Sequence, residues 1–214
     1  MTGSAARYVL YGCAGCGSAV IEALLERAGA DFDFHAVEPW TPGAATDALK
    51  QVNPLAQVPT LALPDATVMT ESAAMIVLLD EAFPDAGILP RRGTAQRALA
   101  LRWLVFIAAN MYAAVSVGDF PERWVEGESA CAALKAGALE RMKAYWKLLE
   151  GAMAPAPYLA GAELCALDIY AATLSHWRPG RAWVDANCPR VAAALALTEA
   201  DSIAVRVWSR NFKH

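Results

Sequence analysis

The sequence has no cluster of lysine and arginine residues, although 18 of its 214 residues are of these two types. Its net charge is −4 at pH 7, and an acidic chain without a basic patch is not expected to bind nucleic acid. The first twelve residues lack a charged segment followed by an apolar core, so we expect no signal peptide. No internal repeat or low-complexity tract is present beyond an enrichment in alanine, which favours helix.

The longest apolar run of the chain is not free of polar side chains. It covers residues 98–117 and contains Arg102 and Asn110, which a membrane span would bury in lipid. We therefore expect a central helix of a soluble helical bundle at this place. The hydrophobic content of 57% leaves no room for an extensively disordered protein.

Cysteine is scarce and odd in number. The five cysteines cannot all pair within one chain, and such a set fits a reducing cytoplasm better than a secreted protein held by disulfides. Besides Cys13 and Cys16, no further pair of cysteines or histidines lies at the spacing of metal ligands. We therefore expect a cytoplasmic protein without a zinc site or any other bound metal.

The first 83 residues alternate between strand and helix patterns. Strands are predicted at 7–12, 31–36, 59–63 and 67–70, and helices at 17–28, near 44–50 and from 71 to 83. Gly29 and Pro84 mark the ends of the first and last of these helices. The order βαβ followed by ββα is that of a thioredoxin-like domain.

Proline and glycine residues mark 84–93 as a linker, and no strand alternation follows it. Helices are predicted at 94–117, 129–153, 166–177 and 189–197, with a further short one at 199–206. The expected organisation is thus an α/β domain at 1–83 and an all-α domain at 94–214.

Two short motifs separated by eight residues describe a ligand site. NPLAQVPTL occupies 53–61, and TES occupies 70–72. A cis bond between Val58 and Pro59 would turn the N–H and C=O of Val58 outward, where an extended peptide could pair with them. Glu71 and Ser72 add the N–H groups of a helix start, a carboxylate and a hydroxyl, which suit an α-amino acid head group. We call these four residues the clamp. Taken singly, they are also typical of an edge-strand proline and a charged helix start.

These motifs resemble the glutathione transferases, and the bacterial beta-type and zeta-like members in particular. YVLYG at 8–12 is similar to the first strand of that family, 13–18 to its catalytic turn, and 161–168 to the start of a core helix in its second domain. The resemblance covers nearly the whole chain. It implies a thioredoxin-like domain that holds glutathione as co-substrate, an all-helical second domain, no tightly bound cofactor, and a homodimer.

The sequence CAGC at 13–16 lies between the first strand and the first helix, and three interpretations of it stay open. Cys13 and Cys16 have the spacing of a redox pair, in which the cysteine nearer the strand is usually the nucleophile. Counted from Tyr11, Cys16 resembles the working cysteine of beta-type transferases, and Ser18 could support the same site. The start of the first helix favours a thiolate at this site, either on Cys16 or on bound glutathione. The third interpretation is inert packing under the helix.

Further contacts to glutathione are expected from the strand and the loop around the clamp. The hydroxyl of Tyr11 could reach the thiol, although a strand tyrosine is more often part of the core. The glycine end of glutathione needs donors from the loop at 38–57, where Trp40, Lys50 and Gln57 are available.

The second substrate is expected between the two domains, facing the helix at 94–117. Phe106 and Asn110 share a face of that helix by i, i+4 spacing, and Trp124 follows in a polar loop. In the beta-type pattern a histidine matches Tyr112. The acid/base role of that histidine is therefore not carried over, and we expect an aromatic wall.

Residues 164–168 resemble the helix-opening Ser/Thr-X-X-Asp box of the family. Cys165 replaces the hydroxyl residue, and sulfur is a weak acceptor. Asp168 is expected to keep its buried structural role at the helix start.

The leading hypothesis is an enzyme that adds the glutathione thiolate to a small electrophile. The clamp holds glutathione, and Cys16 assists its sulfur. A rival enzyme hypothesis is a glutathione-dependent thiol–disulfide reductase that uses Cys13 or Cys16. The third hypothesis is a protein that binds glutathione without catalysis.

Overall fold

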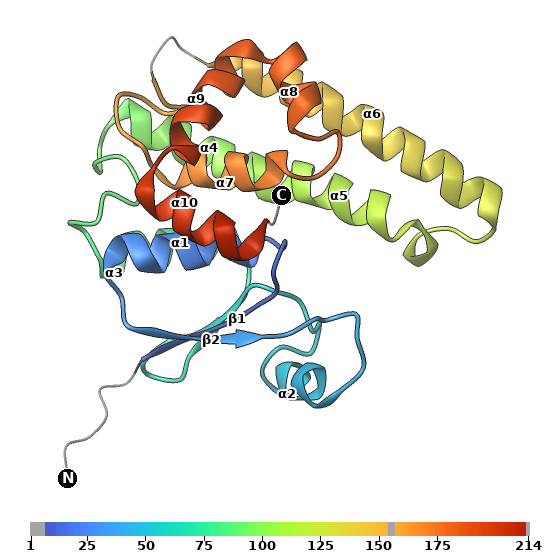
Figure 1. Cartoon of the computed structure of the whole chain (residues 1–214), viewed down its shortest axis with the longest axis horizontal. Coiled ribbons are helices and arrows are strands. Elements are labelled where there is room, and N and C mark those ends of the chain that lie inside the picture. The colour runs from blue at the N-terminus through green and yellow to red at the C-terminus, as the bar shows by residue number, and fades with distance from the viewer. Residues whose placement is uncertain (1–6, 154–156, 213–214) are drawn as a thin grey trace. The chain divides into compact units, whose positions relative to one another are not determined.

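The computed structural model describes residues 7–153 and 157–212 (Figure 1). The chain divides into two compact units. The first comprises the described residues up to Leu89 together with those from Asp201 onward, and the second comprises Pro90–Ala200.

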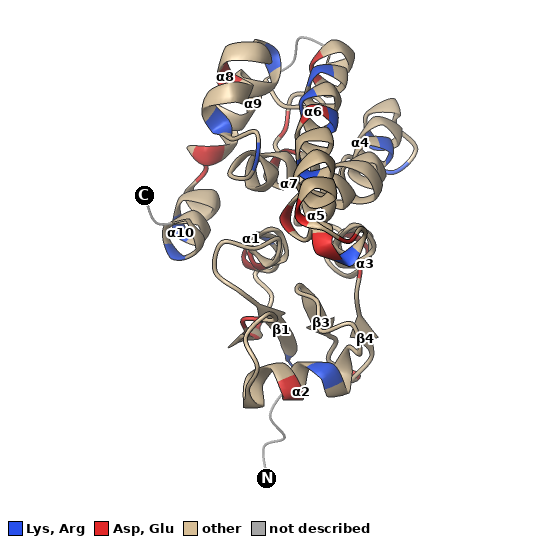
Figure 2. Ribbon diagram, turned by 90° about the vertical axis from the view of Figure 1, so that its right-hand side faces the viewer, with Lys and Arg blue, Asp and Glu red and all other residues tan. Residues whose placement is uncertain are grey.

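The first unit is built on a mixed four-stranded sheet in the order β2-β1-β3-β4. Its strands are β1 (Tyr8–Gly12), β2 (Phe32–Ala36), β3 (Thr60–Ala62) and β4 (Val68–Met69). β2 runs parallel to β1, whereas β3 runs antiparallel to both β1 and β4. Helices α1 (Ser18–Ala28) and α3 (Ser72–Ala82) cover one face, and α2 (Ala44–Val52) lies on the other (Figure 2). The predicted thioredoxin-like arrangement is confirmed.

The core of this unit forms where α1 and α3 meet the sheet. The apolar face of α1 is fully buried, and so are Leu10 on β1 and Leu61 on β3. α1 ends at Gly29, which has a φ of 63°. Glycine adopts this left-handed conformation without the steric cost of a Cβ atom, and the helix therefore stops at the predicted residue.

The second unit is built from helices in its described part, apart from loops and an isolated β-bridge between Tyr158 and Gly161. Its α-helices are α4 (Ala95–Phe106), α5 (Tyr112–Asp119), α6 (Glu128–Ala152), α7 (Ala166–Ser175), α8 (Arg181–Asn187) and α9 (Pro189–Glu199). Every residue of α7 is buried, because α7 packs against both α4 and α9. The sequence does not predict α8, which has only seven residues and follows Pro179 and Gly180 directly. A 3₁₀ turn at Pro121–Arg123 lies within the predicted polar loop.

The helix predicted at 94–117 contains a π-helical turn at Ile107–Met111, between α4 and α5. A π turn takes up an additional residue, so side chains beyond it point to a different face than an uninterrupted α-helix would give them. By length and composition alone the stretch Ala95–Asp119 is apolar enough to cross a membrane. Within the second unit α4 packs on α7, and α5 packs on α6.

The last helix, α10 (Ser202–Asn211), packs on α1 and belongs to the first unit. This differs from the expected all-α domain at 94–214. α10 is amphipathic, and Ala204, Val207 and Trp208 are buried. In Figure 1 it runs as a red helix beside the blue α1.

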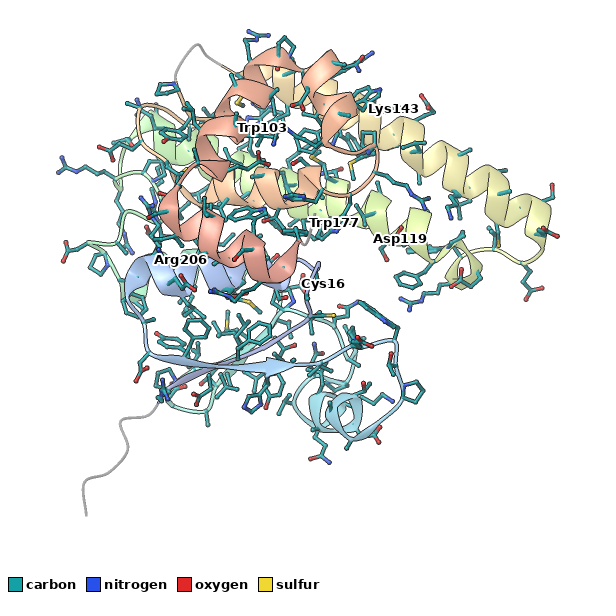
Figure 3. All side chains as sticks on the ribbon, in the orientation of Figure 1. Cys16, Trp103, Asp119, Lys143, Trp177 and Arg206 are labelled. Atoms are coloured by element: carbon teal, nitrogen blue, oxygen red, sulfur yellow. The ribbon has the colours of Figure 1, made fainter. Side chains whose placement is uncertain are left out.

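Charged side chains also join α10 to α1. Arg206 pairs with Glu26 at 3.2 Å (Figure 3), and Arg210 pairs with Glu22 at 2.7 Å and also with Glu26. The side-chain amide of Asn211 donates to the buried carboxylate of Glu22 at 2.8 Å. These partners are about 180 residues apart in the chain, so local sequence patterns cannot reveal the pairing.

Candidate functional site

The turn after β1 requires a glycine and is shaped by a buried serine. A Cβ atom on Gly12 would lie 2.7 Å from the ring of Phe34 and 2.9 Å from Cβ of Ser18. Ser18 is fully buried, and its hydroxyl accepts from the N–H of Cys13 and donates to the carbonyl of Cys13, each at 3.1 Å. The hydroxyl is therefore used on the backbone. Ser18 thus shapes the turn, and its support of chemistry at the thiol stays a prediction.

Both cysteines of the turn are free thiols, with Cys13 buried and Cys16 half-buried at the start of α1 (Figure 3). Burial raises the pKa of Cys16 to about 12, and the proximity of Cys13 adds to this rise. Burial also raises the pKa of Cys13, its contact with the Cys16 thiol lowers it, and the charge of Glu38 raises it. The sequence left open whether the thiolate forms on Cys16 or on bound glutathione, and the raised pKa disfavours Cys16. Cys16 is a neutral hydrogen-bond donor.

The loop before β3 is held by two buried polar residues that the sequence did not assign to the site. The side-chain amide of Asn53 donates to the hydroxyl of Thr60 at 2.9 Å and to the carbonyl of Gln57 at 3.2 Å. The Thr60 hydroxyl donates to the same carbonyl at 2.7 Å. The sequence signal that could have identified them is their position, because Asn53 and Thr60 lie on either side of an apolar segment that contains proline.

The bond between Val58 and Pro59 is cis, as the sequence suggested. Both residues are half-buried. The N–H and C=O of Val58 form no hydrogen bond within the described part of the chain. These two groups can pair with an extended ligand, as in other cases of strand addition.

The second half of the clamp lies at the start of α3. Glu71 is exposed and has a φ of 62°, a left-handed conformation that costs energy for a residue with a side chain. Its carbonyl accepts from the N–H groups of Ala74 and Met75. Ser72 is half-buried and is the first residue of α3. Residues in such conformations often mark binding sites.

The strand registers bring the catalytic turn and both halves of the clamp to one end of the sheet. The turn after β1, the loop before β3 and the start of α3 all lie at that end, because β3 is antiparallel to its neighbours. Continued beyond the last pair, the register of β1 with β3 sets Cys13 opposite Val58. β3 pairs with β4 as far as Leu61 opposite Met69, so Thr70 and Glu71, which lead from β4 into α3, follow at the same end. Neighbouring strands lie about 5 Å apart, so one small peptide can contact all three segments.

The other predicted glutathione contacts differ in their placement. Gln57 is exposed and directly precedes Val58. Trp40 is 56% exposed in the loop after β2, which leaves the sheet at the same end because β2 is parallel to β1. Lys50 pairs with Asp47 at 3.8 Å on α2.

Tyr11 packs against its neighbour in the sheet. Its ring meets the ring of His35 edge-on, with centroids 5.2 Å apart, and the register of β1 with β2 pairs the same two residues. This contact fits the packing role that is more common for a strand tyrosine. A contact of Tyr11 with a thiol stays a prediction.

Two of the residues predicted for the second substrate lie on either side of the π turn boundary. Phe106 packs edge-on against Trp103 and Tyr145, with ring centroids 5.0 and 5.2 Å away. The side-chain amide of Asn110 donates to the carbonyl of Phe106 at 3.3 Å. Phe106 and Asn110 are therefore neighbours on the helix, as predicted, although the ring of Phe106 packs against α6.

The other two predicted residues have different surroundings. Tyr112 contacts the rings of Tyr170 and Trp177, with centroids 5.1 and 5.4 Å away. Trp124 is 63% exposed. The four residues all belong to the second unit, but Phe106 and Tyr112 take part in separate aromatic clusters.

The start of α7 confirms the structural role predicted for Asp168. This residue is fully buried, and its carboxylate accepts from the N–H of Cys165 at 2.9 Å and from the N–H of Leu159 at 2.7 Å. Burial raises the pKa of Asp168, while these hydrogen bonds lower it. Asp168 thus caps the helix and fixes the preceding loop.

Comparison with known proteins places the chain among relatives of one kind. Residues 18–82 match the family model described as glutathione S-transferase, N-terminal domain. The uncharacterized GST-like protein YncG of Escherichia coli strain K12 is 36% identical over 185 residues, which cover 86% of this chain and 88% of that protein.

Two solved structures share the fold over almost the whole chain. A glutathione transferase homolog from Sulfitobacter with bound glutathione has a TM-score of 0.86 and 22% identity, covering 97% of this chain and 100% of that one. A bacterial beta class glutathione S-transferase from Sphingomonas chungbukensis has a TM-score of 0.78 and 24% identity, covering 95% and 98%. The identity to YncG over most of both chains, together with the family match, shows that this chain belongs to the glutathione transferase family.

Proposed function

We propose that this protein binds glutathione at the end of its sheet and adds the glutathione thiolate to a small electrophile. The observation that carries the proposal is the convergence of the catalytic turn, the unpaired backbone of Val58 and the start of α3. The bound glutathione of the Sulfitobacter relative, whose fold this chain shares, supports the same ligand here.

Each part of the site has a chemical role in this proposal. Val58 pairs with the peptide backbone of glutathione through its N–H and C=O. The first N–H groups of α3 and the Ser72 hydroxyl bind the carboxylate of the γ-glutamyl end, and Glu71 binds its ammonium group. Gln57 and Trp40 contact the glycine end.

The reacting sulfur lies beside Cys16. Because Cys16 is protonated at neutral pH, its thiol donates one hydrogen bond to the glutathione sulfur and stabilises the thiolate there. The rate enhancement over the uncatalysed reaction then comes from stabilisation of the thiolate and from positioning of the two substrates. The second substrate contacts the aromatic residues of the second unit.

Calorimetric titration with reduced glutathione tests the clamp. We expect saturable binding to the wild-type protein and a loss of about tenfold or more in affinity for Ser72→Ala, since charge-assisted hydrogen bonds contribute about 1.5–3 kcal/mol. Ser129→Ala is the matched control, because Ser129 is an exposed serine in the first turn of α6. No heat of binding at millimolar glutathione would overturn the proposal.

Steady-state kinetics with a panel of aryl halides and unsaturated carbonyl compounds test the role of Cys16. Cys16→Ala should lower kcat/KM about 100-fold, as loss of one positioned donor does. Cys16→Ser keeps a donor and should retain most of the activity. Equal losses in both variants would remove Cys16 from the mechanism. Saturable glutathione binding without turnover of any electrophile would favour the non-catalytic alternative.

The contact between the thiols of Cys13 and Cys16 supports a second candidate, a glutathione-dependent thiol–disulfide reductase. One cysteine thiolate would attack oxidised glutathione and release reduced glutathione, and the other cysteine would then displace the second glutathione to leave a Cys13–Cys16 disulfide. However, Cys13, the expected nucleophile, is only 6% exposed. Intact mass after incubation with oxidised glutathione separates the two functions, because a stable adduct or a loss of two hydrogens favours the reductase.

The remaining expectations belong to the same proposal. The protein works as a cytoplasmic homodimer in detoxification. Size-exclusion chromatography with light scattering tests the dimer, and a monomer at micromolar concentration would contradict it.

A further inference from the structure

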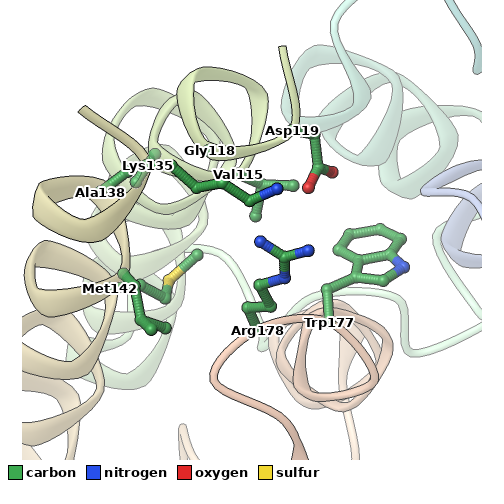
Figure 4. Close-up of a pocket in the computed structure, with 10 residues that line it drawn as sticks. Val115, Gly118, Asp119, Lys135, Ala138, Met142, Trp177 and Arg178 are labelled. Atoms are coloured by element: carbon green, nitrogen blue, oxygen red, sulfur yellow. The ribbon is translucent and has the colours of Figure 1, made fainter. Parts of the chain in front are cut away.

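A cavity of about 30 Å³ lies in the second unit between α5, α6 and the segment after α7. The cavity is lined by three charged residues from separate segments, which are Asp119 at the end of α5, Lys135 on α6 and Arg178 after α7. Figure 4 shows the charged groups of these three residues pointing into the same space, next to the ring of Trp177. The cavity shares no residue with the clamp or the catalytic turn.

The two cations at this cavity have no anionic partner in the described part of the chain. Neither Lys135 nor Arg178 forms an ion pair or a side-chain hydrogen bond there, and all three charged residues are exposed. By contrast, Lys143 on the same helix pairs with Glu140 at 2.7 Å. The cavity thus carries a local charge of +1 on a chain whose net charge is −4.

Size and lining restrict what can bind. A cavity of about 30 Å³ holds about two water-sized groups, which is the size of the two oxygens of a carboxylate. Two cations from separate elements can each donate to one of those oxygens. The ring of Trp177 and the side chains of Val115 and Met142 form the apolar part of the wall, against which an aromatic body can pack.

We propose that this cavity binds the carboxylate of a small aromatic acid, held by Lys135 and Arg178 with its ring against Trp177. A phosphate dianion fits less well, because it is larger and the carboxylate of Asp119 repels a second negative charge. The proposal does not rest on glutathione binding, because the cavity belongs to the second unit and the clamp to the first.

The test uses the full chain and benzoate as the ligand, with the indole N–H resonance of Trp177 as the readout. That resonance is assigned from its loss in Trp177→Phe. We expect it to shift saturably with benzoate. Lys135→Met and Arg178→Gln should each weaken binding about fivefold, as an exposed charge pair allows. Asp119→Asn should tighten binding about twofold, because a like charge is removed.

Matched variants and ligands decide between outcomes. Lys143→Met and Arg141→Gln also remove cations from α6 and should leave benzoate affinity unchanged. Benzyl alcohol, which lacks the carboxylate, should bind at least about fivefold more weakly. A non-saturating shift, equal weakening in the control variants, or equal affinity for benzyl alcohol would each overturn the proposal.

A competition experiment keeps this proposal separate from the glutathione site. Benzoate affinity should be the same with and without saturating reduced glutathione, and the same in Ser72→Ala. Displacement of benzoate by glutathione would place benzoate in the clamp and overturn the inference. Failure of the wild-type protein to bind glutathione would contradict the proposed function and leave the benzoate result intact.

Discussion

At the scale of single residues, burial sets the pKa values of the two thiols in the turn after β1. A helix start stabilises a nearby anion by about 1 kcal/mol or less at an exposed site. Burial acts in the opposite direction on Cys16 and raises its pKa to about 12. The buried side chains of Ser18, Asn53 and Thr60 form hydrogen bonds within the protein. These bonds fix the turn after β1 and the loop before β3.

The raised pKa of Cys16 predicts how fast this thiol is alkylated at different pH values. Only the thiolate reacts, and with a pKa of about 12 its fraction is small at pH 7 and rises about tenfold per pH unit. Iodoacetamide labelling of Cys16, followed by peptide mass spectrometry between pH 6 and pH 10, should therefore show a rate that keeps increasing. A plateau near pH 7 would mean that Cys16 is a thiolate there.

The cap of α7 predicts a stabilising substitution. Cys165 lies at the helix start, where its sulfur is a weak acceptor for the N–H groups of the first turn. A serine hydroxyl accepts more strongly, so Cys165→Ser should raise the free energy of unfolding by a few tenths to about 1 kcal/mol. Chemical denaturation measures the change. A lower stability would contradict this assignment of the cap.

At the scale of elements, the strands and most helices follow from periodicity and from their glycine and proline ends. The π turn at Ile107–Met111 and the helix α8 do not, because neither has a local signature strong enough to distinguish it. The packing of α10 on α1 depends on Glu22, whose side chain is only 7% exposed and meets both Arg210 and Asn211.

Substitution of Glu22 should weaken this packing. Glu22→Ala leaves the Asn211 amide and the Arg210 guanidinium without their shared acceptor, at a cost of about 1–3 kcal/mol in the free energy of unfolding. Glu140→Ala is the control, because Glu140 forms an exposed pair with Lys143 and should change stability little. If Glu22→Ala and Glu140→Ala lowered the free energy of unfolding equally in urea denaturation, Glu22 would have no special role in this packing.

At the scale of the whole molecule, the chain crosses into the second unit at Pro90 and returns to the first at Asp201. The helix α10 therefore completes the unit that carries the clamp residues. The family resemblance, the two-part organisation and the clamp motifs could be recognised from the sequence, whereas the return of the chain could not.

Truncation after Ala200 tests this organisation. Removal of α10 exposes the face of α1 against which Val207 and Trp208 are buried, so amide hydrogen exchange in α1 should accelerate. The amides of α7 in the second unit should keep the protection that they have in the full chain. Faster exchange in α7 with an unchanged α1 would contradict the division of the chain.

The strands, the thioredoxin-like order and the two motifs of the clamp can be recognised in the sequence, because they depend on periodicity and on the backbone preferences of neighbouring residues. The folded structure was needed to show that burial raises the pKa of Cys16, that Ser18 bonds to the backbone, that α10 joins the first unit, and that Lys135 and Arg178 line one cavity. Burial, solvation and contacts between distant residues produce these features, and none of them is a local property of the chain.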